Sequence, residues 1–174
     1  TPAQQPNNCT ATSVTVPGVG TYSVDSSGVM TFDPLPTYVG TPTPLKYQIT
    51  DNKGQVANST YTPTVIGAPT ATLNTTSGPQ NTPQSVNILT NDAAATGTTL
   101  VASTVLLCDP NTNPAQTSPN CTVAPGSTIT VANVGTYSVT AAGVITFTPV
   151  TGYIGTPPAL NYQVSDALGQ KATS

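Results

Sequence analysis

The sequence contains one hairpin-like stretch twice. The segment GTYSVDSSGVMTFDP, residues 20–34, returns as GTYSVTAAGVITFTP at residues 135–149, an offset of 115 residues. The match extends past both copies, since YVGTP at residues 38–42 returns as YIGTP at residues 153–157. Similarity at a fixed offset is typical of chains built from tandem structural repeats. We therefore expect two copies of one module with a period of 115 residues.

The pattern of side chains within each copy favours β-strands. Larger side chains recur at every second residue, the period of a half-buried strand: Tyr22, Val24, Met30, Phe32, Leu45, Tyr47 and Ile49. Strands are expected along both hairpins and at residues 14–16, 45–50, 55–65, 70–73, 85–89 and 103–107. About seven short strands per module, separated by turn signals, are typical of an antiparallel sandwich. The predicted fold is all-β, with tandem immunoglobulin-like antiparallel β-sandwich repeats.

The best candidate for a boundary is Gly67-Ala68-Pro69, a short stretch that should form a stiff joint. Residues 1–66 are then the C-terminal part of one repeat. Residues 67–174 are a nearly complete second repeat that lacks its last strand. By the offset, the strand that is missing should resemble residues 60–63.

Composition excludes several classes of function. Charged residues make up 5% of the chain, with a net charge of −3 and no histidine, whereas about 25% is usual. Such a chain offers no basic patch for nucleic acid. It has no apolar run long enough to insert in a membrane. Without His or Glu it offers no acid–base constellation, so no catalytic residue and no enzyme is expected.

The three cysteines point to an oxidising compartment. Cys108 and Cys121 enclose a loop of twelve residues and are the natural disulfide pair, worth about 3 kcal/mol in the chain-entropy model. Cys9 corresponds to Cys121, so its partner is expected upstream of residue 1. A free or intermolecular thiol at Cys9 is the alternative. Three scattered cysteines without histidine do not favour a metal site.

Three aspartates are weak candidates for a calcium site. Asp51 and Asp166 stand in the D-x-x-G turn of both copies, where capping of a β-turn is the simpler interpretation. Asp92 could contribute to a site near the start of the second module. Calcium takes six to eight oxygen ligands, and acids are too sparse here for a clustered cage. We expect no cofactor, with calcium as the one alternative.

The repeated block VPGVGTYSVDSSGVMTFDPLPTYVGTPTPLKYQITDNKGQVANSTYTPTV resembles the CshA-type fibril repeat of bacterial surface adhesins. The earlier segment APTATLNTTSGPQNTPQSVNILTNDAAATG also resembles the opening of that family, where an Asn-Asp pair follows an apolar strand. The resemblance implies an extracellular module on the bacterial cell surface. It also implies a structural role in a fibril or stalk and carries over no catalytic residue.

The leading hypothesis is therefore a structural repeat of a filament or adhesin stalk, whose partners are neighbouring identical repeats or subunits. A ligand-binding module that grips a host or surface glycan or protein is the alternative. Tyr38 and Tyr153, in the extended loops outside the strand pattern, are its candidate contacts. A third possibility is a filament subunit that polymerises by strand complementation between chains.

Overall fold

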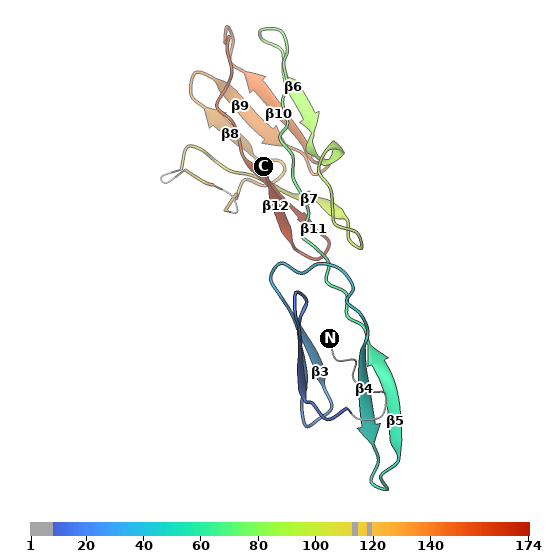
Figure 1. Cartoon of the computed structure of the whole chain (residues 1–174). Coiled ribbons are helices and arrows are strands. Elements are labelled where there is room, and N and C mark those ends of the chain that lie inside the picture. Colours follow the sequence, from blue (N-terminus) through green and yellow to red (C-terminus); the bar gives the residue numbers. More distant parts are fainter. Residues whose placement is uncertain (1–8, 113–114, 118–119) are drawn as a thin grey trace. The chain divides into compact units, whose positions relative to one another are not determined.

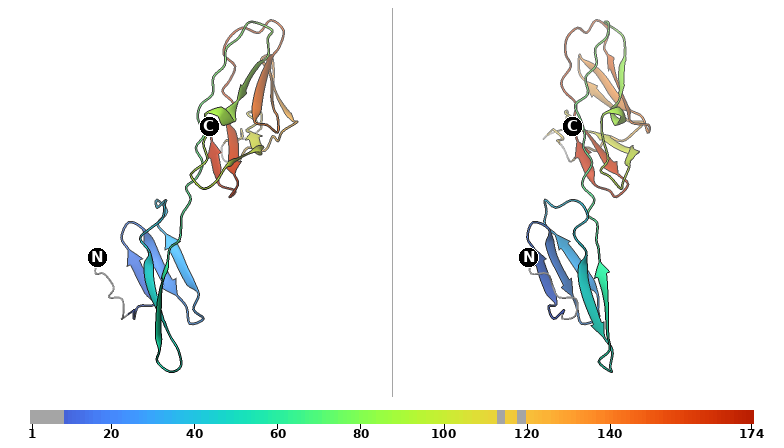
Figure 2. Two further views of the ribbon diagram at one scale, coloured as in Figure 1. Left: turned by 90° about the vertical axis from the view of Figure 1, so that its right-hand side faces the viewer. Right: turned by 45° about the vertical axis from the view of Figure 1, so that its right-hand side comes forward.

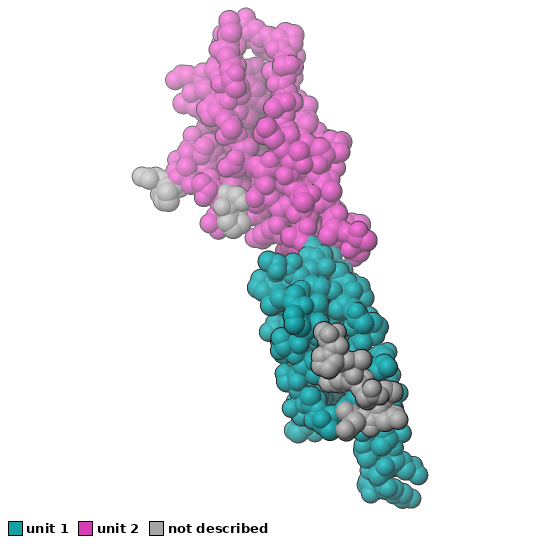
Figure 3. All heavy atoms as spheres, in the orientation of Figure 1, with its two compact units in different colours: residues 1–67 teal, residues 68–174 magenta. Residues whose placement is uncertain are grey.

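The computed structural model describes residues 9–112, 115–117 and 120–174 (Figure 1). The chain divides into two compact units, Thr1–Gly67 and Ala68–Ser174, called unit 1 and unit 2 below and coloured separately in Figure 3. The described residues contain no helix long and apolar enough to cross a membrane.

Unit 2 is a sandwich of two antiparallel sheets (Figures 1 and 2). The first sheet has the order β6-β10-β9-β8 and the second β12-β11-β7. A 3-10 turn, Ile88–Thr90, follows β6. The strands are β6 Gln84–Asn87, β7 Leu100–Leu107, β8 Thr128–Val131, β9 Gly135–Val139, β10 Val144–Pro149, β11 Tyr162–Asp166 and β12 Lys171–Thr173.

The core of unit 2 lies between these two sheets. One side contributes Ile88, Ile129, Tyr137, Val139 and Phe147, and the other contributes Val105, Leu107, Tyr162, Val164 and Ala172. Apart from Ile88, which lies in the 3-10 turn, these residues hold inward positions of the strands, because successive side chains of a strand point to opposite faces. The predicted all-β sandwich class is confirmed.

Unit 1 has fewer strands. A three-stranded sheet has the order β1-β2-β3, and β4 and β5 form a separate two-stranded sheet. Both are antiparallel, and β2 pairs with β3 from Gly20↔Pro34 to Val24↔Met30. The strands are β1 Ser13–Val16, β2 Gly20–Val24, β3 Met30–Pro34, β4 Leu45–Thr50 and β5 Val56–Tyr61.

One predicted strand is wrong. Residues 70–73 form no strand, and Thr70 makes only an isolated antiparallel bridge with Ala93. The reason is that the side chain of Asp92 supplies a hydrogen-bond acceptor that a neighbouring strand would otherwise provide. The carboxylate of Asp92 accepts the backbone N–H of Thr72 at 2.8 Å, so the backbone there is satisfied without a ladder.

The repeated hairpins need a glycine at their first position. A Cβ built on Gly135 would collide with the carbonyl oxygen of Thr148 and the ring of Phe147, and Gly20 has the matching clash with Asp33 and Phe32. The ring of Phe147 in β10 therefore lies close to the glycine of β9, with no space for a side chain between them. This close approach explains why both copies begin with Gly.

Gly135→Ala is expected to destabilise unit 2 by about 1–3 kcal/mol, because overpacking forces the Phe147 ring or the strand to shift. Urea unfolding measures the loss. Gly78→Ala is the matched control, since its new Cβ would meet only the flexible side chain of Gln84. Equal stability of the two variants would contradict the steric role of Gly135.

Candidate functional site

A groove is present in each unit. The groove of unit 2 has a volume of about 530 Å³ and runs between loop residues 73–80 and 153–161, with Tyr137 and Phe147 also in its wall. The groove of unit 1 has a volume of about 440 Å³, with walls from both of its sheets. These two grooves are concave surfaces where a ligand or a further segment could bind.

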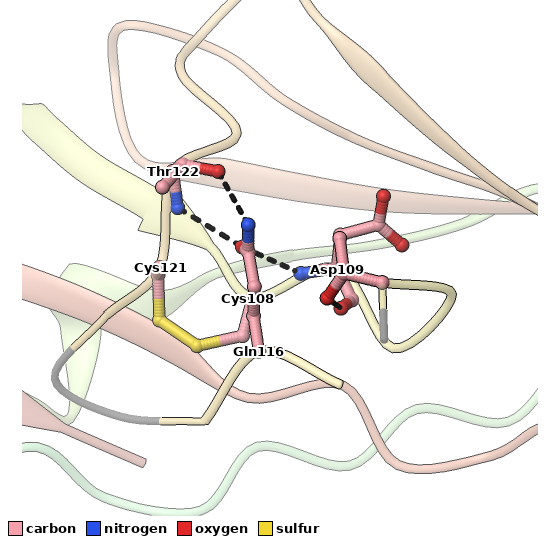
Figure 4. The surroundings of a disulfide bond; sticks show 6 residues. Cys108, Asp109, Gln116, Cys121 and Thr122 are labelled. Atoms are coloured by element: carbon pink, nitrogen blue, oxygen red, sulfur yellow. Dashed lines mark hydrogen bonds between the residues drawn. A yellow bond between two sulfur atoms is a disulfide. The ribbon is translucent and has the colours of Figure 1, made fainter. Parts of the chain in front are cut away.

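Cys108 and Cys121 form a disulfide, with Cα atoms 4.0 Å apart (Figure 4). Both side chains are buried. The loop that they close is organised by Gln116, whose Oε1 accepts the backbone N–H groups of Asp109 and Thr122 and whose Nε2 donates to the hydroxyl of Thr122 at 2.7 Å. The disulfide therefore fastens the residue after β7 to the segment that precedes β8.

Cys9 forms no disulfide within the described residues. Its Sγ lies 4.0 Å from the backbone carbonyl oxygen of Lys46, in the wall of the unit 1 groove. Its expected partner upstream of residue 1 stays a prediction.

Asp51 and Asp166 occupy equivalent turns and make equivalent hydrogen bonds. One carboxylate oxygen of Asp51 accepts the N–H groups of Lys53 and Gln55, and one of Asp166 accepts those of Leu168 and Gln170. These are the bonds of a capped turn. Among the residues that the structure describes, no three His, Cys, Asp or Glu side chains gather into a group that could hold a metal ion.

Asp92 is a buried carboxylate in the core of unit 2. Both of its oxygens lie 2.9 Å from the hydroxyl of Tyr162, which donates to the carboxylate. Asn74 also donates to that hydroxyl, at 3.2 Å. This network was not predicted from the sequence, because Tyr162 lies 70 residues from Asp92 and 88 residues from Asn74. It ties the opening segment of the unit to β11.

The comparison with known families decides what these units are. Residues 3–65 and residues 67–174 each match the surface adhesin CshA repetitive domain. The chain belongs to this family. No curated protein and no solved structure matches the chain. The predicted resemblance to a CshA-type repeat is confirmed. The family implies a repetitive module of a cell-surface adhesin. This family suggests a non-enzymatic role.

In both CshA-type repeats the loop tyrosines pack against the hairpin. Tyr38 meets Phe32 edge-on, with ring centroids 6.5 Å apart, and Tyr153 meets Phe147 at 6.3 Å. Both are half-buried. They differ in one respect, since Tyr153 lines the unit 2 groove whereas Tyr38 does not line the unit 1 groove.

The buried hydroxyl of Tyr162 makes the stability of the second CshA-type repeat sensitive to alkali. Burial, and then the hydrogen bond to Asp92, raise the pKa of Tyr162 above its ordinary value of 10.0. Burial also raises the pKa of Tyr137 in the same repeat. From about pH 10 upward the unfolded chain releases protons that the folded chain keeps, so the free energy of unfolding falls as the pH rises.

Tyr162→Phe should make this fall shallower. Urea unfolding of both proteins between pH 8 and pH 11 provides the measurement. At pH 8 the variant is expected to be less stable by about 1–3 kcal/mol, because Asp92 loses a hydrogen-bond donor. The difference should shrink toward pH 11. If the difference in stability between the two proteins stays constant with pH, the Tyr162 hydroxyl is not the source of the alkaline loss of stability.

Proposed function

We propose that this chain is a structural repeat module of an extracellular bacterial fibril or adhesin stalk, without catalytic activity. The observation that carries the proposal is that two CshA-type repeats follow one another in one polypeptide. Only residue 66 lies between the two matched segments. A short connection that includes Pro69 favours a stiff joint between neighbours.

The chemistry of the side chains supports this role. Polar and aromatic groups that could act on a ligand are engaged in building the fold: aspartates cap turns, tyrosines pack on phenylalanines, and a disulfide secures a loop. In arrays of this kind, stability comes from each repeat and from the interfaces with its neighbours. The proposed partners are therefore identical repeats along the array.

The mass of the reduced and denatured parent chain tests the single-chain form of this proposal. A long polypeptide with many repeats is the expected result. A short polypeptide that still builds filaments would instead indicate subunits that polymerise by strand complementation between chains.

A ligand-binding module is the second candidate, and the unit 2 groove is the observation that favours it. A glycan or protein segment could contact Tyr153 and the exposed Ile154 there. Tyr153→Ala tests this, with Tyr38→Ala as the matched control that removes the same edge-on contact outside a groove. Loss of adhesion in Tyr153→Ala alone would favour ligand binding. Equal adhesion of both variants is expected from a structural repeat.

Calcium stays a candidate at Asp51, Asp92 or Asp166, although their oxygens already accept hydrogen bonds from the protein. We expect a chelator such as EDTA to leave the midpoint of thermal unfolding unchanged, because these bonds persist without metal. Calorimetry with and without EDTA measures this. A lower midpoint that added calcium restores would establish a calcium site.

A further inference from the structure

The two units bury equivalent residues to very different extents. Val164 in β11 is 0% exposed, whereas Ile49, its counterpart 115 residues earlier in β4, is 63% exposed. Val164 belongs to the core cluster that contains Val105 and Leu107 of β7. Among residues 9–67, no strand corresponds to β7. Ile49 therefore occupies a position that is buried in unit 2, where β7 lies beside β11 and Val164 shares a core cluster with Val105 and Leu107.

The open edge of β4 lies where that strand would pair. In unit 2, β11 pairs with β12 on one edge and with β7 on the other, with Tyr162 opposite Leu107 and Asp166 opposite Leu100. In unit 1, β4 pairs only with β5 among the described residues. Unpaired strand edges are templates for a further strand.

One backbone carbonyl marks the register of the missing strand. In unit 2 the carbonyl oxygen of Asn161 accepts the N–H of Cys108 at 2.9 Å. Its counterpart in unit 1 is Lys46, whose carbonyl oxygen faces the Sγ of Cys9. Cys9 is the counterpart of Cys121, the disulfide partner of Cys108. A cysteine placed as Cys108 is placed would thus meet both Lys46 and Cys9.

The groove of unit 1 has the shape and chemistry of an acceptor for such a strand. Its wall includes Cys9, Tyr22, Met30, Lys46, Gln48 and Ile49. The groove therefore runs along β4, beside the thiol of Cys9 and the side chains of Tyr22, Met30 and Ile49.

We propose that the unit 1 groove accepts a strand of the β7 type, with alternating apolar side chains and a cysteine at its end, supplied by a half-repeat that precedes residue 1 in the same polypeptide. The strand pairs with β4 antiparallel, covers Ile49, and forms a disulfide with Cys9. This proposal rests on the tandem array proposed above. The β7 strand of a second copy does not fit as the donor, because it is paired with β11 and its Cys108 is already bonded to Cys121.

The covalent step needs an oxidant, which we assign to a small-molecule disulfide such as oxidised glutathione. The Cys9 thiolate attacks one sulfur of the oxidant and releases one thiol. The thiolate of the strand then attacks Cys9 in the mixed disulfide and releases the second thiol. Two protein thiols lose two electrons and two protons, and one oxidant molecule becomes two thiols.

A peptide with the sequence of residues 98–109, TTLVASTVLLCD, is the probe, mixed with the full chain and oxidised glutathione. Docking holds the two sulfurs at an effective concentration in the millimolar range. At ~100 µM the peptide should therefore cross-link to Cys9 at least about tenfold faster than a scrambled peptide that keeps its cysteine. Mass spectrometry identifies the bond. Equal rates, or a covalent dimer through Cys9 of one copy and Cys108 of another, would overturn the proposal.

Two further arms separate docking from thiol chemistry. The same peptide with serine for cysteine should slow hydrogen exchange in β4, and Ile49→Ala should abolish this protection whereas Val39→Ala, exposed and outside the groove, should not. The full chain extended at its N-terminus by a copy of residues 68–112 should bond Cys9 to the added cysteine, across a loop of the same length as that between Cys108 and Cys121. The proposal is contradicted if the Cys9 thiol stays reactive in the extended chain, or if the peptide does not slow hydrogen exchange in β4. Neither result would contradict the proposed role in a fibril.

Discussion

Leu107→Ala is expected to lower the free energy of unfolding of unit 2 by about 2–5 kcal/mol. This is the usual cost of truncating a buried leucine, because the surrounding residues relax only partly into the cavity. Leu107 is 0% exposed, and it lies in the part of β7 that pairs with Tyr162 of β11. Its backbone also bridges to Val123, next to the disulfide. Truncation leaves a cavity between the sheets. Urea unfolding, monitored by circular dichroism, measures the resulting loss of stability.

The matched control is Leu73→Ala, which removes the same atoms from a side chain that is 75% exposed. We expect a change within about 0.5 kcal/mol, as is usual for surface positions. Similar losses in the two variants would contradict the assignment of β7 to the centre of the core.

Removal of the Cys108–Cys121 bond should cost about 3 kcal/mol, since a closed loop of this size restricts the unfolded chain by about that amount. The sequence separation is 13. Alanine at both positions avoids buried unpaired hydroxyl groups. Thermal unfolding of the double variant, compared with the parent chain under oxidising conditions, measures the loss.

Cys9→Ala is the control for this prediction, because Cys9 forms no disulfide within the described residues. It should leave the stability of unit 2 unchanged. If the parent chain loses no stability when a reducing agent is added, the disulfide contributes nothing and the chain-entropy argument is wrong here.

The strands that alternation defines were predictable from the sequence. The hairpin of unit 1 forms as β2 and β3, and that of unit 2 as β9 and β10. Their side chains fill the sandwich because a period of two places one face inward. The pairing of Cys108 with Cys121 also followed from local spacing, since the two cysteines bound one loop.

Features that depend on long-range contacts were not predictable. Thr72 was expected in a strand, but Asp92, 20 residues away, takes its N–H group. Tyr162 was expected only as a strand residue, and the structure buries its hydroxyl against the same carboxylate. The exposure of Ile49 was hidden as well, because alternation identifies an inward face and not whether a partner sheet covers it.

The most direct test of the structural role is the length of surface fibrils as a function of the number of encoded repeats. Electron microscopy of cells that display shortened and lengthened arrays provides the measurement. A structural repeat predicts that fibril length changes in proportion to repeat number, while adhesion through a distal region persists. Fibrils of constant length, with adhesion that is lost as repeats are removed, would contradict it.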